Sequence, residues 1–345
     1  MDTKNVVVII NPVSGQSDPE QRKQDISQAL EEHGCLCRFI ETSEQCNIKE
    51  LCDNAINEGA DLLAVSGGDG TVIQVLSALA GTRVAVAILP AGTGNLLSQN
   101  LGIPLNLCDA VDVALSGNVY DLDLARSGDG RHFVIMGGMG LDGQIIHDAD
   151  RTVKNRWGVF AYFWAAAKNM TRRLEPVTIS IDGRPPIRRR AKSVVAVNMG
   201  KMTAGLNAFP TASPCDGLLE IGILKMEAFP QGLRMLYNML LGRPQLTSEL
   251  ETIQATRVQI HSIFPQPLQF DGEYVGQFRD LSAEILPKSV CILVPEDLPD
   301  TASVSETLPD VSIERSYRLN FPVLLGVVAL AASVSTYYCI KSLRK

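Results

Sequence analysis

Cysteine and histidine are present, but never in an arrangement typical of a metal centre. The eight cysteines form no C-x-x-C pair, and the four histidines stand at no zinc-ligand spacing and suggest no Ser-His-Asp or Cys-His catalytic group. A basic excess is also lacking, because 31 Lys and Arg face 38 Asp and Glu, for a net charge of −7. Proteins that coat DNA or RNA are normally basic. The sequence therefore predicts free thiols in a reducing compartment, no zinc site and no nucleic-acid partner.

A secretory signal is missing as well, since the chain runs at once into the strand-like segment Val6–Ile10. The length of 345 residues suggests two domains, and 46% hydrophobic against 20% charged residues excludes a mostly disordered chain. One segment differs from this average. Pro295–Glu314 holds six acids, no base and three prolines, which predicts a solvated acidic linker over 295–318.

The segment Leu319–Ile340 near the end of the chain contains no charged side chain. As a helix these 22 residues would span about 33 Å, enough to cross a bilayer core of about 30 Å. Tyr337 and Tyr338 near its end and three bases beyond it resemble interfacial anchors. We therefore expect a transmembrane helix over 319–340; a buried core helix is the alternative.

The first part of the chain, 1–118, alternates strand-like and helix-like segments. Apolar runs at Val6–Ile10, Cys35–Ile40, Asp61–Val65 and Val84–Leu89 alternate with helical spacing over 19–32, 47–58 and 72–80. Such alternation predicts right-handed βαβ crossovers and a Rossmann-like parallel α/β domain.

Three turns of this domain follow strands and are rich in glycine or small polar residues. They are Asn11-Pro12-Val13-Ser14-Gly15, Gly67-Gly68-Asp69-Gly70-Thr71 and Pro90-Ala91-Gly92-Thr93-Gly94-Asn95. In a parallel sheet such turns share the carboxyl edge, where glycine N–H groups and helix amino termini favour anions. The first and third segments could equally be ordinary tight turns without a ligand. Asp69 could equally serve only as a helix cap. The second, with a carboxylate and a hydroxyl among three glycines, is typical of magnesium and phosphate binding.

From about residue 119 the strands follow one another without helices. Eight short apolar segments between Asp121 and Leu286 predict an antiparallel β-sandwich over 119–280, and residues 281–294 are candidates to return to the first domain. The expected fold class is therefore α/β plus all-β, followed by the linker and the transmembrane helix.

The three turns, in this order, resemble those of the diacylglycerol kinase catalytic-domain family, especially the bacterial soluble-type lipid kinases, which are related to sphingosine kinases. The resemblance extends to Gly138-Met139-Gly140-Leu141-Asp142, to the segment from Asn198 to Leu218 and to Asp271-Gly272-Glu273, and covers roughly residues 5–294. It implies ATP as phosphoryl donor, Mg²⁺, and a lipid hydroxyl as acceptor.

The resemblance also implies the roles of individual residues. Glu273 falls on the proton acceptor, and Asp69 would orient phosphate or metal. The nucleotide would be bound by Asn11, Ser14, Gly15, Thr42, Gly67, Gly68, Asp69, Gly70, Thr71, Val72, Ile73, Gly92, Thr93 and Asn95. Magnesium would be bound by Ser213, Asp216 and Leu218, partly through main-chain oxygens.

Two positions depart from the pattern of the family. Many members have Asn-Asp where this chain has Asn95-Leu96, and a triple-glycine stretch is reduced to Gly205 in residues 202–205. Two basic clusters suggest contact with an anionic membrane surface, one over 151–173 and one comprising Arg184, Arg188, Arg189, Arg190 and Lys192. A core-facing helix and a solvated hairpin edge explain these clusters about as well.

The sequence thus predicts a membrane-anchored lipid kinase with its catalytic domains in the cytoplasm, where nucleotide is available. Diacylglycerol, converted to phosphatidic acid, is the expected substrate. NAD kinase is one alternative, because that family shares the Gly-Gly-Asp-Gly turn. A catalytically inactive, membrane-tethered lipid-binding protein is the other, because of Leu96. The oligomeric state is left open, a homodimer included.

Overall fold

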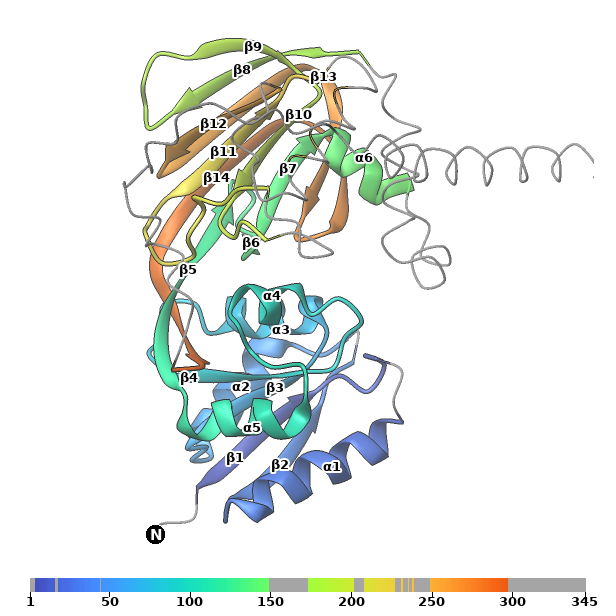
Figure 1. Ribbon diagram of the computed structural model, residues 1–345, viewed down its shortest axis with the longest axis vertical. Helices are drawn as coiled ribbons and strands as arrows, with labels where there is room; N and C mark the ends of the chain where they lie inside the picture. The colour runs from blue at the N-terminus through green and yellow to red at the C-terminus, as the bar shows by residue number, and fades with distance from the viewer. Residues whose placement is uncertain are drawn as a thin grey trace, which may run out of the picture. The chain divides into compact units, whose positions relative to one another are not determined.

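A computed structural model describes residues 4–15, 18–43, 45–148, 173–201, 208–226, 231, 235, 238 and 249–296. Residues Met1–Ser303 form one compact unit. Figure 1 shows its two kinds of architecture, a parallel α/β domain and a region of antiparallel strands. The two-domain architecture predicted from the sequence is confirmed, while the predicted boundaries 1–118 and 119–280 stay predictions.

The α/β domain is built on four parallel strands in the order β2-β1-β3-β4. The strands are β1 (Asn5–Ile10), β2 (Leu36–Glu41), β3 (Leu62–Gly67) and β4 (Ala85–Pro90), and the helices are α1 (Pro19–Glu32), α2 (Ile48–Asn57), α3 (Asp69–Ala78), α4 (Leu96–Asn100) and α5 (Leu107–Ser116). The predicted strands lie within one or two residues of the observed ones. The prediction missed α4 and α5, which follow the third turn.

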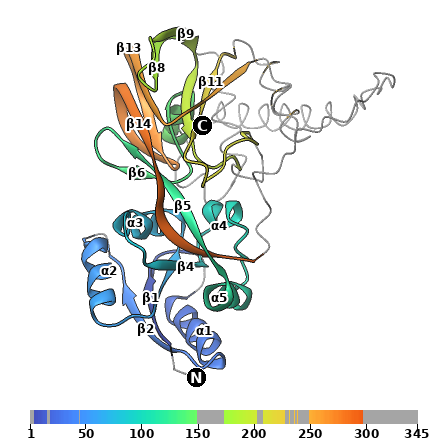
Figure 2. The same ribbon diagram turned by 90° about the vertical axis from the view of Figure 1, so that its left-hand side faces the viewer.

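Helices cover both faces of this sheet, as Figure 2 shows. Successive side chains of a strand point to opposite faces. Val7 and Ile9 of β1 accordingly pack into the core with α2 and α3, whereas Val6, Val8 and Ile10 pack with α1 and α5. A strand buried on both sides reads as a continuous apolar run, which is why the sequence revealed it so clearly.

The second domain consists mainly of antiparallel strands. Its elements are β5 (Asn118–Ser127), β6 (His132–Phe133), β7 (Met136–Gly140), α6 (Leu141–Asp148), β8 (Glu175–Ile181), β9 (Ile187–Ala191), β10 (Ser193–Val197), β11 (Leu219–Leu224), β12 (Leu250–Ala255), β13 (Arg257–Phe270) and β14 (Glu273–Val294). The rings of Phe133 and Phe270 stack in its core with centroids 5.3 Å apart. The predicted segments 257–261 and 266–270 are parts of one strand, and β9 and β12 were not predicted.

Strand β14 belongs to both domains. Its first half pairs antiparallel with β13, and its last residues pair parallel with β4, Cys291 opposite Ala85 and Ile292 opposite Val86. The hydrogen-bonded sheet is therefore continuous from the parallel strands to the antiparallel ones.

The predicted carboxyl-terminal membrane anchor needs correction. Among the residues that the structure describes, no helix is long and apolar enough to cross a bilayer. The segment 319–340 and most of the linker lie outside those residues. The single-pass anchor and the localisation derived from it are therefore not carried forward.

The pairing of β14 with β4 generates a prediction about stability. Ile292 is fully buried between the helices and the sheet, so Ile292→Ala should lower the free energy of unfolding by about 2–5 kcal/mol. Leu36→Ala, at a side chain 64% exposed, serves as the control and should cost less than about 0.5 kcal/mol. Urea denaturation followed by circular dichroism measures both, and equal losses would contradict the assignment of β14 to the α/β core.

Candidate functional site

The turn after β1 is hydrogen-bonded to the turn after β3. The Asn11 side-chain amide donates to the Thr71 hydroxyl over 2.8 Å, and the Gly68 N–H donates to the Ser14 hydroxyl over 3.3 Å. The guanidinium of Arg22, from α1, donates to the carbonyls of Asn11 and Ser14. These contacts fix the first turn against the second at the carboxyl edge of the sheet.

The second turn leads directly into α3 without a side-chain cap. Asp18, Asn47 and Asn106 cap α1, α2 and α5 by accepting hydrogen bonds from first-turn N–H groups. The N-cap of α3 is Gly68, which has no side chain to do so. The first N–H groups of α3 and its positive dipole end are thus available to an anion, as in known phosphate sites.

The third turn touches the second. A Cβ atom added to Gly92 would lie 2.6 Å from the Gly68 Cα, a distance that no side chain tolerates. Asn95, in the left-handed region at φ 46°, accepts from the Gly92 N–H and donates to the Gly92 carbonyl, both over 2.8 Å. The close approach explains the glycine at position 92, and the structure brings the three turns together as the sequence suggested.

Asp69 lies at the start of α3, and its carboxylate also binds the start of α4. Its Oδ1 accepts from the Leu97 N–H over 2.9 Å, and a Cβ on Gly94 would lie 3.2 Å from its Oδ2. Leu96, at the position of the departure from the family pattern, packs against the apolar core of the α/β domain. Position 96 thus contributes to packing here, and Asp69 is the carboxylate at this turn.

Glu273 begins β14 and lies next to the second turn. A Cβ on Gly70 would stand 3.5 Å from Glu273 Oε1. The carboxylate of Glu273, which is exposed, therefore faces the same loop that offers N–H groups to an anion. Residues 70 and 273 come from different domains, and only the fold brings them together.

The turn that carries Glu273 is held by the neighbouring carboxylate of Asp271. Its two oxygens accept from three consecutive backbone N–H groups, those of Val134, Ile135 and Met136, over 2.8–2.9 Å. Burial raises the pKa of the Asp271 carboxyl to about 6, against the opposing effect of these three donors. The negative charge of Asp69 raises this pKa further, which places Asp271 near the second turn.

A second chain of hydrogen bonds holds the same turn. The Gly272 N–H donates to Gln269 Oε1 over 2.9 Å, and Gln269 Nε2 donates to Asp142 Oδ2 over 3.1 Å. Ser193 donates to the other oxygen of Asp142. Asp142 is partly buried, and burial raises the pKa of its carboxyl. The sequence analysis assigned no role to Asp271, Gln269 or Ser193. The Asp-Gly-Glu motif was the only sequence feature that marked this turn, and it pointed to Glu273.

The remaining predicted nucleotide residues divide into two groups. Thr93 is exposed at the third turn and Gly15 lies against it, since a Cβ on Gly15 would meet the Ala91 carbonyl at 2.2 Å. The side chains of Val72 and Ile73 are part of the apolar core, and Thr42 is buried. Val72, Ile73 and Thr42 can therefore contact a nucleotide only through their main-chain atoms or as part of the wall of its binding site.

The predicted magnesium residues form a separate cluster at the turn before β11. Asp216 is exposed, and its Oδ1 accepts from the Leu218 N–H over 2.9 Å. Both oxygens of Asp123 in β5 accept main-chain N–H groups, from Gly217 and Lys288, each over 2.7 Å. Burial, and then the charge of Asp123, raise the pKa of Asp216.

This donor set fits a magnesium ion that keeps several waters. Mg²⁺ commonly binds one or two carboxylates and retains part of its water shell. Asp216 offers one carboxylate, and carbonyls of the same turn offer neutral oxygens. Among the described residues, no three His, Cys, Asp or Glu side chains group together as a metal site would require, so such an ion would depend on main-chain oxygens and water.

The two basic clusters are only partly available for a membrane. Of the first, all but Arg173 lies outside the residues that the structure describes. In the second, Arg189 makes two hydrogen bonds of 3.1 Å to Glu251, and Lys192 is 6% exposed. Residues 202–205, the reduced glycine stretch, also lie outside the described part.

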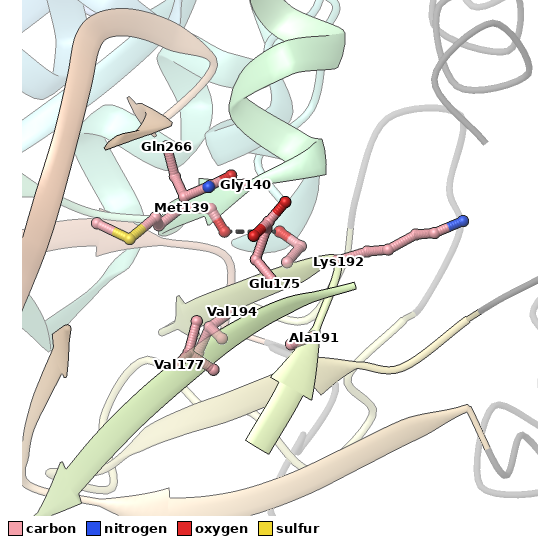
Figure 3. A pocket seen from close by; sticks show the side chains of 9 residues that line it. Met139, Gly140, Glu175, Val177, Ala191, Lys192, Val194 and Gln266 are labelled. Atoms are coloured by element: carbon pink, nitrogen blue, oxygen red, sulfur yellow. Dashed lines mark hydrogen bonds between the residues drawn. The ribbon is translucent and has the colours of Figure 1, made fainter. Parts of the chain in front are cut away.

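A small hollow beside β10 contains none of the predicted site residues. Figure 3 shows its lining, in which Met139, Gly140, Glu175 and Gln266 surround the start of β10, where the Ser193 hydroxyl oxygen lies 3.1 Å from the Met139 carbonyl oxygen. A second pocket lies between the domains, lined by residues that include Asn100, Tyr120, Lys201 and Phe209.

Comparison with known proteins agrees with this geometry. A family model described as "Diacylglycerol kinase catalytic domain" matches residues 5–127, and one described as "YegS C-terminal NAD kinase beta sandwich-like domain" matches residues 136–294. A diacylglycerol kinase of Mycobacterium tuberculosis is 28% identical over 74% of this chain and 84% of its own. The probable lipid kinase YegS of Salmonella arizonae is 26% identical over 83% and 96%.

The fold is also that of a solved structure. The crystal structure of a putative diacylglycerol kinase from Bacillus anthracis superimposes with a TM-score of 0.71, at 24% identity, over 86% of this chain and 99% of that one. With both domains matched in order, the chain belongs to the diacylglycerol kinase catalytic-domain family, in its two-domain form with a YegS-type carboxyl-terminal domain, and it is a phosphotransferase.

Proposed function

We propose that this protein transfers the γ-phosphoryl group of ATP to a lipid hydroxyl, with diacylglycerol as the substrate and phosphatidic acid as the product. The observation that carries the proposal is the position of Glu273 against Gly70, which sets a carboxylate beside an anion-binding loop. The names of the relatives, a diacylglycerol kinase and a probable lipid kinase, support a lipid acceptor.

The glycine-lined turns would bind the triphosphate. N–H groups of residues 69–71 at the uncapped start of α3 would donate to phosphate oxygens, and the Thr71 hydroxyl, itself accepting from Asn11, would donate its proton in the same direction. The third turn, held close by Asn95, closes the opposite wall. Bound Mg²⁺ would supply positive charge for the phosphates, and Asp69 is the side chain that would orient it or its waters.

Glu273 would act as the proton acceptor. As the acceptor hydroxyl attacks the γ-phosphorus, its proton must leave, and a positioned carboxylate accepts it. Asp271 holds the turn through residues 134–136 and touches neither substrate in this scheme, so it is a positioning residue. Asp216 and its turn lie apart and would bind a structural magnesium ion.

The alternatives are tested in the same assay. The purified chain is incubated with labelled ATP, Mg²⁺ and either diacylglycerol or NAD. Transfer to lipid alone supports the proposal, transfer to NAD alone supports the NAD kinase alternative, and no transfer supports an inactive lipid-binding protein. Mass spectrometry of the products over a panel of lipid alcohols identifies the acceptor.

The first prediction concerns the proton acceptor. Glu273→Gln keeps the shape of the side chain and removes its basicity, so kcat should fall about 100- to 10,000-fold with little change in ATP affinity. Glu31→Gln, at an exposed carboxylate in the last turn of α1, is the matched control and should stay near the wild-type rate. If the kcat of Glu273→Gln stays within a factor of two of wild type, Glu273 is not the proton acceptor.

The second prediction concerns the pH dependence that Asp271 imposes. Its pKa of about 6 lies above the ordinary value of 3.8, and only the ionised form can accept all three N–H groups. Activity should therefore fall as the pH drops through about 6 and be independent of this group above pH 7. In Asp271→Asn an amide NH₂ opposes a backbone N–H, so kcat at pH 8 should be about 10- to 100-fold lower. The acid limb near pH 6 should disappear from the rate profile of this variant, and an unchanged limb would refute the role.

The third prediction concerns the contact between the phosphate turns. Gly92→Ala must push Gly68 away, because the added Cβ would lie 2.6 Å from its Cα. The Kd for ATP, measured by calorimetry, should rise about tenfold or more, while thermal unfolding shows that the variant is folded. Unchanged ATP affinity in a folded variant would mean that these turns do not bind the nucleotide.

A further inference from the structure

The first half of β14 has a free edge. Strand β13 pairs with it on one side, whereas β5 pairs with it on the other side only from Ala283 onward. Within the part of the chain that the structure describes, residues 273–282 therefore have one strand partner. Their outward side chains include Tyr274, 36% exposed, and Phe278, 42% exposed.

A bulge in β13 adds two apolar side chains beside Phe278. His261 lies opposite Asp280 and Gln266 opposite Phe278, so four residues of β13 stand against Arg279 alone. Two of these four are Ile263 and Phe264, which are 55% and 56% exposed. Bulges of this kind redirect side chains, here outward from the sheet.

We call Ile263, Phe264 and Phe278 the hairpin surface. Tyr274 is not part of it, because Tyr274 lies opposite Gln269 and Phe278 opposite Gln266, which puts their side chains on opposite faces of the hairpin. The other large apolar side chains that are exposed in the described residues are aliphatic and stand apart along the chain, at Val13, Leu36, Leu105 and Val119. Concentrated exposed apolar side chains mark a site of interaction, whereas scattered ones do not.

The hairpin surface and the proposed proton acceptor share a strand. Phe278 belongs to β14, which begins with Glu273, and the ring of Tyr274, next to Glu273, packs edge-on against His147 of α6 with centroids 4.7 Å apart. The turn beneath it is held by Asp271 and Gln269. Whatever occupies the hairpin surface is thereby held at a fixed distance from Glu273.

We propose that the hairpin surface docks on the lipid bilayer and delivers Glu273 to the headgroup level. The inference rests on the proposed function, because a diacylglycerol hydroxyl lies at the membrane–water boundary and its acyl chains do not leave the bilayer. Phenylalanine and isoleucine beside Arg279 and the His261–Asp280 pair form the mixture of apolar and polar groups that settles at that boundary. A second copy of the chain on the same edge would cover the strand that carries Glu273.

The docking is apolar, which sets it apart from attraction by the basic clusters. Contact through Phe and Ile needs no anionic lipid and persists at raised ionic strength, whereas contact through exposed arginines is screened by salt. Neutral vesicles of phosphatidylcholine with diacylglycerol are therefore the probe that isolates the hairpin surface.

The test uses the full chain and a double variant, Phe264→Ser with Phe278→Ser. Flotation with the neutral vesicles should show binding about 10- to 100-fold weaker than wild type, at low and at high salt. The rate on diacylglycerol in vesicles should fall in parallel, while the rate on a short-chain, monomeric diacylglycerol stays unchanged. Leu36→Ser with Leu105→Ser, which removes equally exposed side chains elsewhere, is the matched control and should bind as wild type does. Phe264→Trp with Phe278→Trp should keep both binding and vesicle activity.

Several outcomes would overturn the inference. The first is unchanged vesicle binding by the double Ser variant. The second is an equal loss of rate on the short-chain diacylglycerol, because the surface would then affect catalysis and not docking. Conversion of a wild-type dimer to a monomer without loss of vesicle binding would assign the surface to a second copy. Failure of the proposed function looks different: wild type and Glu273→Gln would then transfer nothing to either acceptor, while flotation still measures docking.

Discussion

The carboxylate of Asp271 sets the geometry on which the site depends. A turn at the end of a long hairpin would ordinarily be mobile, because only two strands support it. Here one buried carboxylate accepts from three consecutive N–H groups of the segment 134–136, and that segment continues into β7. The left-handed conformations of Asp271 and Gly272, at φ 47° and 82°, are maintained by these bonds and by the Gly272 bond to Gln269. Without these hydrogen bonds the carboxylate of Glu273 would hardly stay beside Gly70, because residues 70 and 273 are far apart in the sequence and no local contact links them.

The glycines of the site make a second constraint. Gly92 lies against Gly68 backbone to backbone, so the two turns can approach only because Gly92 carries no Cβ. Gly68 has no side chain to cap α3, whereas α1, α2 and α5 have Asp or Asn caps. The domain thus gives up a stabilising cap, worth about 1 kcal/mol, at the start of α3. Such local losses are typical of functional sites.

The sequence predicted the α/β domain well and the second domain less well, for physical reasons. The strands β1, β3 and β4 are buried on both faces and read as unbroken apolar runs, which fix their limits closely. Strand β9 (Ile187–Ala191) carries three arginines on a sheet edge and offers no such pattern. Strand β13 contains Pro265 and Pro267 beside its bulge, so it reads as two strands. The glycine turns could be found because their chemistry is local. Asp271 and Asp142 stand in motifs that the sequence revealed, but their roles could not be predicted, because their hydrogen-bond partners lie far away in the sequence.

The departure at Leu96 changes the charge balance at the nucleotide edge. Where many relatives place an acid, this chain buries an apolar side chain, and Asp69 binds the start of α4 in addition to lying at the start of α3. The negative charge of Asp69 raises the pKa of Asp271, so the two carboxylates repel each other. An additional acid at position 96 would strengthen that repulsion, and a triphosphate without its metal would do the same. With leucine in place of the acid, less positive charge is needed at this edge, and the metal ion that accompanies ATP would be the main counter-charge. Leu96 is therefore compatible with the proposed reaction, in which each of the remaining carboxylates has a distinct role. Asp69 would orient phosphate, Asp271 holds the turn, and Glu273 would accept the proton.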